Sequence, residues 1–178
     1  MEYSIKEVAK IIGAKGNELH DDAITILLTD SRTVSFPEQS LFFALKTKTN
    51  DGHKYIPELY KLRVRNFVVS EMAPEFANLT DANFLLVKDP LRALQQLAIH
   101  HRKKFDIPVI GITGSNGKTI VKEFLYQLLH TEFNIVRSPR SFNSQLGVPL
   151  SVWQINPKHT LGIFEAGISQ PDEMERLQ

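Results

Sequence analysis

The order of hydrophobic and polar positions in the first part of the chain predicts short strands alternating with helices. Ile5, Val8 and Ile12 share one helical face, between Ser4, a typical N-cap, and Gly13, a typical helix stop. The same pattern predicts strands at 23–28, 41–45, 66–70 and 83–88, and a helix at 53–62. Strands that alternate with helices indicate an α/β fold.

Helical periodicity returns at Pro90, a favourable first helical residue, and continues to Phe105. We predict that this helix connects two domains, 1–105 and 106–178. Its basic end, 100–104, suits a helix C-terminus, and we expect it to be solvated rather than to bind a ligand.

The second part of the chain is also expected to be α/β. Apolar runs predict strands at 107–112, 134–137 and 161–166, helical spacing predicts helices at 121–129 and 146–153, and acidic residues at 172–177 suggest the first turns of another helix. These strands are fewer than the ~5–6 usual for a sheet. We therefore expect a mostly parallel but truncated second domain.

Composition narrows the class of protein. The chain has 178 residues, 42% of them hydrophobic, and 21 basic against 20 acidic residues, so no bulk charge favours nucleic acid. It has no cysteine, which excludes disulfides and thiolate metal sites. No segment resembles a signal peptide or a membrane span. We expect a soluble, cytoplasmic protein without membrane insertion.

The most specific motif follows the strand predicted at 107–112. The run Thr113-Gly114-Ser115-Asn116-Gly117-Lys118-Thr119 joins this strand to the next helix. Small residues let backbone N–H groups converge on phosphate, Lys118 adds a positive charge, and Thr119 offers a hydroxyl to Mg²⁺. The dipole and free N–H groups of the helix N-terminus also favour an anion. The motif predicts ATP, with Mg²⁺, as the ligand.

This loop departs from the pattern G-x-x-x-x-G-K-[ST] at one position. The pattern places a glycine where this chain has Ile112, and Gly111 stands one residue earlier. Two later residues are further candidates. Asn143 follows a predicted strand, and Glu165 ends another, where doubly wound folds present metal ligands. With Thr119, Glu165 is a candidate Mg²⁺ ligand; without the loop, a solvated strand-end acid would be the better interpretation.

Together these motifs resemble the ATP-binding core of the Mur ligases, the family that builds the peptide of bacterial cell-wall precursors. The resemblance includes the departure at Ile112 and extends to Asn143-x-x-x-Gly147 and Glu165-Ala166-Gly167. The segments 30–32, 41–45 and 50–53 are similar to the family's N-terminal domain. With 121–123 they most resemble the members that add D-alanyl-D-alanine to UDP-N-acetylmuramoyl-tripeptide, some of which are fused to an alanine racemase.

The resemblance implies an acyl-phosphate mechanism, in which ATP phosphorylates the peptide carboxylate and the amine of D-alanyl-D-alanine attacks it. It implies catalytic roles for Lys118 and Asn143, ATP binding by 113–119, and Mg²⁺ binding by Thr119 and Glu165. It also implies that residues 1–105 bind the UDP-muramoyl-peptide, and that 106–178 are part of an ATPase domain. The residues expected at the UDP-sugar are Ser31, Arg32, Asn50, Asp51 and His53.

Alternatives stay open. The chain could belong to a diaminopimelate- or lysine-adding ligase, to a folylpolyglutamate synthase, or to a non-catalytic module that binds a nucleotide sugar. A generic P-loop kinase or GTPase is a weaker alternative, because the sequence shows no guanine-recognition motif. Residues 30–32 and 51–53 could also be turns whose side chains bond the local backbone. The resemblance further implies that this fragment is inactive alone, and it leaves the oligomeric state open.

Overall fold

A computed structural model describes residues 1–16 and 20–167 of the chain. The chain separates into two compact units, Met1–Leu97 and Ala98–Gln178. Within the described residues both units are α/β with mostly parallel sheets, which confirms the predicted fold class. The helix expected at 172–177 lies outside the described residues. No helix in the described ranges combines the length and apolar character needed to cross a membrane.

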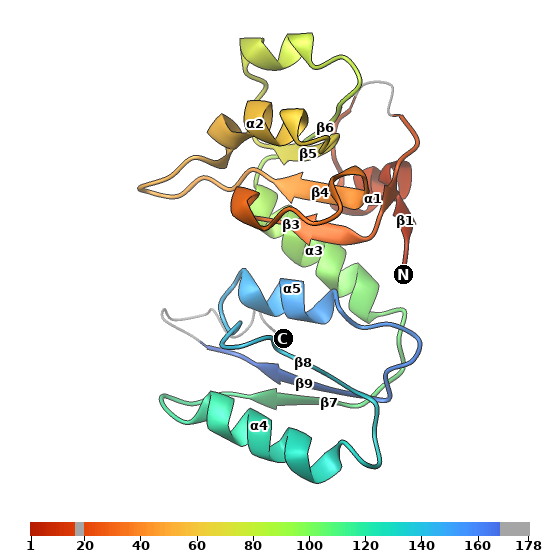
Figure 1. Ribbon diagram of the computed structural model, residues 1–178, viewed down its shortest axis with the longest axis vertical. Helices are drawn as coiled ribbons and strands as arrows, with labels where there is room; N and C mark the ends of the chain where they lie inside the picture. The colour runs from red at the N-terminus through yellow and green to blue at the C-terminus, as the bar shows by residue number, and fades with distance from the viewer. Residues whose placement is uncertain (17–19, 168–178) are drawn as a thin grey trace. The chain divides into compact units, whose positions relative to one another are not determined.

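The first unit is built on a parallel sheet. Its strands, in the order β3-β4-β5-β6 (Figure 1), are Ile26–Leu28, Ser40–Phe43, Asn66–Val69 and Asn83–Leu86. The single strand predicted at 23–28 is divided in two, because β2 (Ala23–Ile24) pairs antiparallel with β1 (Tyr3–Ser4) instead of joining this sheet. Thr25, at the break, bonds Gln39 through both its backbone N–H and its hydroxyl.

Helix α1 (Ile5–Ile12) begins and ends where the sequence predicts, whereas the helix predicted at 53–62 is divided into a 3-10 turn and a shorter α-helix. In α1 the Ser4 hydroxyl accepts the Glu7 N–H, and Gly13 ends the helix in the left-handed region at φ 62°. A short 3-10 turn, η3 (Gly52–Tyr55), leads into α2 (Ile56–Lys61). Three more 3-10 turns, η1, η2 and η4, cover Ser31–Thr33, Pro37–Gln39 and Pro74–Asn78.

Strand alternation places the core of the first unit on both faces of its sheet. Phe42 and Phe67 point to the face where α2 contributes Ile56 and Leu59. Their neighbours Leu41, Phe43, Val68 and Leu85 are equally buried but belong to the opposite face. The sequences of these strands are therefore continuous apolar runs, as is typical of strands buried on both faces.

The basic end of the long helix α3 (Pro90–Arg102) is more buried than predicted. His101, expected to be solvated, is 1% exposed. Its ring packs on Phe105 and Trp153, and Nε2 lies 2.9 Å from the carbonyl oxygen of Ile155. Local sequence could not show this burial, because Trp153 and Ile155 lie about fifty positions later in the chain.

The second unit is a parallel sheet in the order β7-β9-β8 (Figure 1). Its elements are β7 (Val109–Ile112), α4 (Lys118–Leu129), β8 (Ile135–Arg137), α5 (Gly147–Val152) and β9 (Leu161–Glu165). Helices α4 and α5 cover opposite faces. Leu161 and Ile163 pack with side chains of α4, whereas Phe164 packs with Val152 of α5. Alternation along β9 therefore turns Glu165 toward the α4 face.

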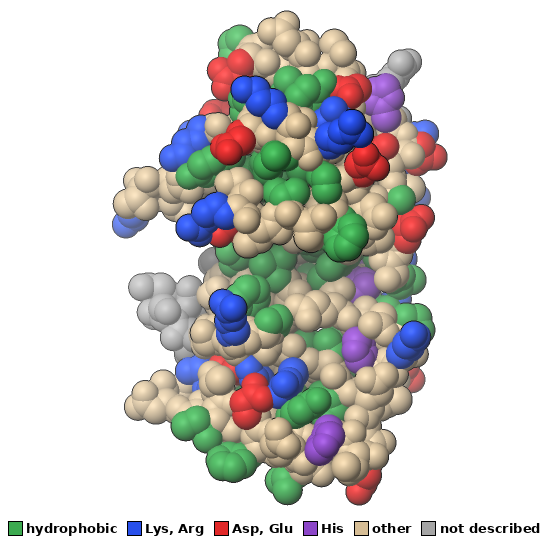
Figure 2. Space-filling view, in the orientation of Figure 1, with side chains coloured by type: hydrophobic (Ala, Val, Ile, Leu, Met, Phe, Trp, Pro, Cys, Tyr) green, Lys and Arg blue, Asp and Glu red, His purple; other side chains and the backbone are tan. Residues whose placement is uncertain are grey.

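The apolar face predicted for α4 is only partly buried. Leu125 and Leu129 pack against the sheet, but Phe124 is 65% and Leu128 72% exposed. Hydrophobic side chains accordingly gather on the surface over this helix (Figure 2). The apolar run at 107–112 would suit a strand buried on both faces, yet β7 is an edge strand of the described sheet and Val109 is exposed. Both apolar segments would need more covering residues than the described part of the chain supplies.

We predict that acid destabilises the second unit through His101. Burial lowers the pKa of this imidazole below its ordinary 6.5, so the unfolded chain binds a proton at higher pH than the folded chain does. The free energy of unfolding should therefore fall as the pH drops through 6.5 toward the lowered pKa. Urea denaturation across this range measures it.

His101→Gln should remove most of this pH dependence. The exposed His130→Gln should keep it, and His159, whose pKa burial also lowers, should account for the remainder. Equal pH dependence in His101→Gln and the wild type would contradict the assignment.

Candidate functional site

The loop 113–117 connects the end of β7 to the first turn of α4. Gly114 has φ 138° and Gly117 φ 79°, values that side chains with a Cβ rarely adopt. The loop residues are exposed, whereas Ile112 is buried with Leu161 and Ile163. Ile112, which stands where the common motif has its first glycine, is thus a core residue of β7. The loop itself begins at Thr113.

Lys118 lies over the loop that it is predicted to serve. Its Nζ donates a 2.6 Å hydrogen bond to the carbonyl oxygen of Gly114. This bond closes the loop upon itself. A phosphate bound by the loop amides would give the ammonium a charged partner in place of the carbonyl, and charge-assisted hydrogen bonds are the stronger kind.

Thr119 and Glu165, predicted together as Mg²⁺ ligands, lie side by side. The Thr119 hydroxyl donates to Oε2 of Glu165 at 3.1 Å, although the residues are 46 positions apart. Glu165 is fully buried, and its Oε1 accepts no hydrogen bond among the described residues but forms an ion pair with Lys122. Two adjacent oxygens around octahedral Mg²⁺ lie about 3.0 Å apart, given bonds of ~2.1 Å. The pair therefore fits this cation.

Sequence reasoning missed Lys122 as a site residue. Its side chain is fully buried, and Nζ lies 3.0 Å from Oε1 of Glu165. It also donates to the carbonyl oxygens of Ser138 at 2.9 Å and Arg140 at 2.5 Å. A signal was present, since Lys122 stands three and seven residues before Leu125 and Leu129, the apolar residues of α4 that face the sheet.

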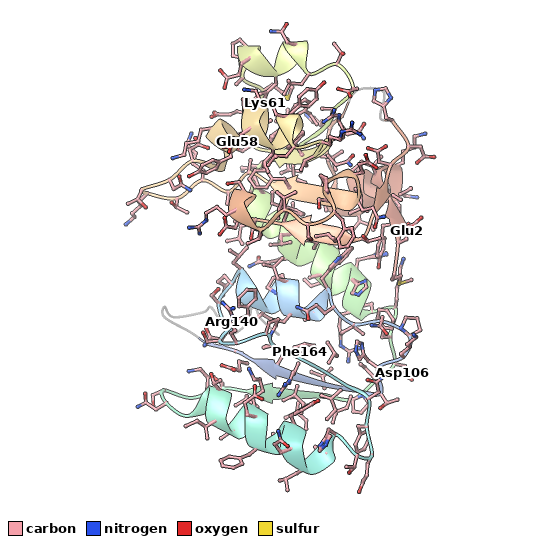
Figure 3. All side chains as sticks on the ribbon, in the orientation of Figure 1. Glu2, Glu58, Lys61, Asp106, Arg140 and Phe164 are labelled. Carbon is pink, nitrogen blue, oxygen red and sulfur yellow. The ribbon has the colours of Figure 1, made fainter. Side chains whose placement is uncertain are left out.

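Asn143 lies against the end of β9. Its backbone carbonyl accepts the N–H of Gly167 at 2.6 Å. A Cβ at Gly167 would lie 3.1 Å from Cγ of Asn143, so a glycine allows this close approach. Arg140 precedes Asn143 in the same loop and is labelled in Figure 3. It lies toward the carboxyl ends of β7 and β9, whereas Asp106 lies at the other end of this sheet. The loop bearing Asn143 thus contacts the segment that follows Glu165.

In the first unit, Ser31 and Arg32 form η1, directly after β3. The Arg32 guanidinium pairs with Asp30 at 2.6 Å and is 86% exposed. Hydrogen bonds from the Arg32 side chain and backbone lower the pKa of Asp30 to about 2. The local turn considered as an alternative is therefore present, and it leaves the guanidinium at the surface.

Asn50, Asp51 and His53 follow the neighbouring strand, β4, so they share the carboxyl edge of the sheet with Ser31 and Arg32. Asp51 caps η3 by accepting the His53 N–H at 3.0 Å, and Asn50 accepts from the Tyr55 hydroxyl. Burial raises the pKa of Asp51, but hydrogen bonds from His53 and Lys46 outweigh it and bring the pKa to about 2.

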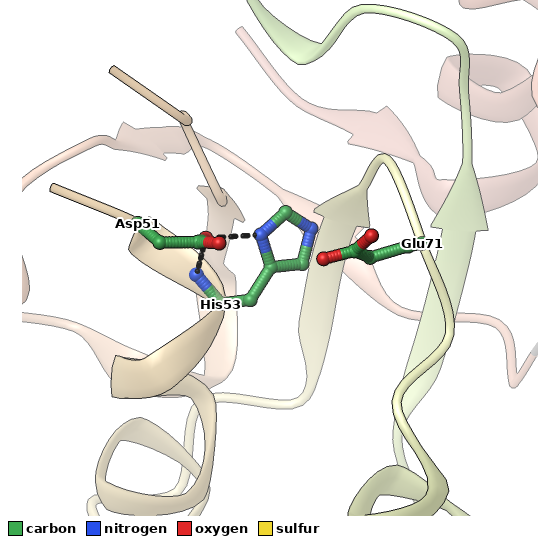
Figure 4. Close-up of side chains that lie close together, drawn as sticks. All are labelled: Asp51, His53 and Glu71. Carbon is green, nitrogen blue, oxygen red and sulfur yellow. Dashed lines mark hydrogen bonds and ion pairs between the residues drawn. The ribbon is translucent and has the colours of Figure 1, made fainter. Parts of the chain in front are cut away.

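Asp51, His53 and Glu71 lie close enough to suggest a metal site (Figure 4). The ring of His53 is already engaged, since Nδ1 lies 2.6 Å from Asp51 and Nε2 accepts the Ser70 N–H. The ammonium of Lys46 lies 3.3 Å from Asp51 and 3.4 Å from Glu71. A cation is therefore already supplied by the chain, and the cluster ties two loops together.

Comparisons with known proteins point to a single family. Residues 112–178 match the model of the Mur ligase middle domain. The UDP-N-acetylmuramoyl-tripeptide–D-alanyl-D-alanine ligase of Bacillus subtilis is 28% identical to this chain, over 98% of this chain and 38% of that protein. The ligase of the same name from Borreliella burgdorferi is 31% identical, over 98% of this chain and 36% of that protein. The Synechocystis ligase of this name is 36% identical over 84% of this chain and 32% of its own length.

Two solved structures show the same fold. The diaminopimelate–D-alanyl-D-alanyl ligase of Acinetobacter baumannii superposes with a TM-score of 0.89 at 23% identity, over 99% of this chain and 39% of that one. The MurF ligase of Thermotoga maritima, solved in complex with ADP, gives a TM-score of 0.70 at 28% identity, over 85% and 34%. The chain thus spans less than two fifths of the length of these relatives.

A parallel sheet, a glycine-rich loop at the carboxyl end of one strand and a lysine opening the next helix define the second unit as a P-loop α/β domain. Among proteins with such a domain, the relatives that match both units over nearly the whole chain are Mur ligases. The chain belongs to the Mur ligase family.

We predict that Gly52→Ala destabilises the first unit. A Cβ at this position would lie 2.8 Å from the Leu45 nitrogen and 2.9 Å from Cα of Ala44, both backbone atoms that cannot rotate away. The free energy of unfolding should fall by about 1–3 kcal/mol in chemical denaturation. Gly111→Ala is the control, because a Cβ there meets nothing within 4 Å. Equal stabilities of the two variants would refute the packing argument.

Proposed function

We propose that this chain is part of an ATP-dependent amide ligase that adds D-alanyl-D-alanine to UDP-N-acetylmuramoyl-tripeptide through an acyl phosphate. The observation that carries the proposal is the contact between Thr119 and Glu165 beside the phosphate loop. Similarity to ligases of this name over nearly the whole chain supports the substrate assignment. The reaction consumes ATP and a nucleotide-linked precursor, so we propose a cytoplasmic location.

In the proposed reaction the second unit holds the phosphates of ATP. The N–H groups of 113–119 would surround them at the N-terminus of α4, and Lys118 would neutralise charge on the transferred phosphoryl group. Thr119 and Glu165 would hold Mg²⁺, which supplies positive charge to the phosphate oxygens when bound. Such positioning and electrostatic stabilisation account for most of the catalysis of phosphoryl transfer.

Asn143 would orient the carboxylate that receives the phosphoryl group. Its backbone carbonyl accepts the N–H of Gly167, and a Cβ at Gly167 would lie 3.1 Å from Cγ of its side chain. An amide N–H donates to an acyl oxygen without adding charge. The amine of D-alanyl-D-alanine would then attack the activated carbonyl and release phosphate.

We propose that the first unit binds the UDP portion of the precursor at the carboxyl edge of its sheet. Arg32 is the residue best suited to contact pyrophosphate, because its guanidinium is exposed and can grip phosphate with two parallel hydrogen bonds. Ser31 and Asn50 would add neutral contacts, while Asp51 and His53 would shape the loop. His53 is buried, so its contribution would be indirect.

The chain alone should not turn over, because it spans less than two fifths of its relatives. Two other functions remain as outcomes of experiment. A ligase with a different acceptor would use ATP but not D-alanyl-D-alanine, whereas a nucleotide-sugar-binding module would bind the UDP precursor without any need for Lys118.

We predict that Lys118→Ala lowers the turnover of the full-length ligase about 10²- to 10³-fold, as the loss of one charge-stabilising group does. Phosphate release with ATP, UDP-muramoyl tripeptide and D-alanyl-D-alanine measures the rate. Lys158→Ala, an exposed lysine before β9, should leave the rate unchanged. Robust phosphate release by Lys118→Ala would rule out the assigned role, and no release by the wild type would rule out the proposed reaction.

We also predict that Arg32→Ala weakens binding of the UDP precursor about 10- to 100-fold, the cost of a lost charged hydrogen bond. Calorimetry with UDP-muramoyl tripeptide measures this, and the affinity for ADP should not change. Arg92→Ala removes an exposed guanidinium from α3 and serves as the control. Equal affinity of Arg32→Ala and the wild type would show that pyrophosphate binds elsewhere.

A further inference from the structure

The buried ammonium of Lys122 is an unusual feature of the phosphate-loop helix. Lys122 has no exposed surface, and burying a charge is costly unless partners compensate it. Four oxygen atoms lie around Nζ, at 2.5 Å (Arg140 O), 2.9 Å (Ser138 O), 3.0 Å (Glu165 Oε1) and 3.3 Å (Glu123 Oε1). The ammonium is thus held by the loop that follows β8 and by the end of β9.

These contacts divide the two oxygens of Glu165 between different partners. Oε1 faces Lys122, whereas Oε2 accepts the hydroxyl of Thr119. The backbone of Glu165 is fixed as well, since its N–H donates to Oγ of Ser138 at 3.0 Å. The carboxylate is therefore held at both ends and has little freedom to rotate.

The position of Nζ is equally constrained. Arg140, one of the residues whose carbonyl it binds, has a left-handed backbone at φ 49°, which is uncommon for a residue other than glycine. The bond from Lys122 helps to hold this conformation, which directs the Arg140 carbonyl inward. Because the ammonium is tied to two carbonyls, it cannot withdraw from Oε1 without leaving both unpaired.

We propose that Lys122 is a positioning residue that limits Glu165 to presenting a single oxygen, Oε2, and so favours Mg²⁺ over Ca²⁺ at this site. The inference rests on the proposed function, which assigns Thr119 and Glu165 to the cation. Mg²⁺ requires near-octahedral geometry with short bonds, whereas Ca²⁺ accepts more ligands and often takes both oxygens of one carboxylate. With Oε1 engaged by Lys122, the two-oxygen mode is blocked.

A purely structural role for Lys122 makes a different prediction. If the ammonium only balanced a buried charge, a neutral replacement would lower stability and weaken both cations alike, whereas arginine, which keeps the charge, would leave both affinities at the wild-type value. If it restricts Glu165, replacing it should change the preference between the cations. Cation preference therefore distinguishes the two roles.

The test measures ADP binding to the full-length ligase by calorimetry. The measurement is repeated over a range of Mg²⁺ concentrations and, separately, of Ca²⁺ concentrations. In Lys122→Gln we expect the Mg²⁺ concentration for half-maximal ADP binding to rise about 10- to 100-fold, as it does when a partner that orients a metal ligand is lost. The Ca²⁺ requirement should change less, so the Mg²⁺ preference should fall. An unchanged preference would overturn the proposal.

Glu123→Gln is the matched control. Glu123 is adjacent in the sequence and its carboxylate lies 3.3 Å from the same ammonium, but its side chain is 46% exposed and it also pairs with Arg137. Removing this carboxylate should leave the cation preference at the wild-type value. A shift as large as that of Lys122→Gln would overturn the assignment to Glu165.

Lys122→Gln leaves Glu165 as an unpaired buried charge and could fail to fold, which thermal unfolding would show. Lys122→Arg then carries the test, because a guanidinium fork can bind both carboxylate oxygens and should weaken Mg²⁺ and Ca²⁺ together. Wild-type cation affinities in Lys122→Arg would overturn the proposal. If wild-type ligase binds no ADP with Mg²⁺, the proposed function itself fails.

Discussion

The buried ion pair between Lys122 and Glu165 is the contact on which the candidate phosphate site depends. It joins α4, which opens with Lys118 and Thr119, to β9, and it reaches the loop after β8 through two carbonyl oxygens. Taking both charges out of water is costly, and removing only one partner typically costs about 3–5 kcal/mol. The pair is therefore weak support for stability but strong support for a fixed geometry.

The first unit uses ionic contacts for a different end. Lys46 bridges Asp51 and Glu71, and His53 joins the loop after β4 to the Ser70 N–H after β5. Most of these groups are partly exposed, so their Coulomb energies are screened. They shape the edge of the sheet beside the exposed Arg32, whereas the buried pair of the second unit sets the position of individual oxygen atoms.

Secondary structure was largely predictable because its causes are local. The Ser4 hydroxyl caps the start of α1 and Gly13 ends it with a positive φ, while apolar runs of Phe, Leu and Val indicated β4 to β6. The division of 23–28 between two sheets was not predictable, because it depends on pairing with Tyr3 and Gln39. The burial of His101 was missed for the same reason, since its partners Trp153 and Ile155 are distant in the sequence.

The sequence by itself determined the chemistry that this protein can offer: small residues at 113–117, a lysine and a threonine at the start of a helix, and a carboxylate at the end of a strand. Tertiary structure decided which of these groups meet. Parallel pairing of β7 with β9, and the alternation of side chains along β9, bring Glu165 to Thr119 and Lys122. Only the packed sheet could show that a lysine on the inner face of α4 holds one oxygen of that carboxylate, because helical periodicity indicates which face is buried but not what it meets.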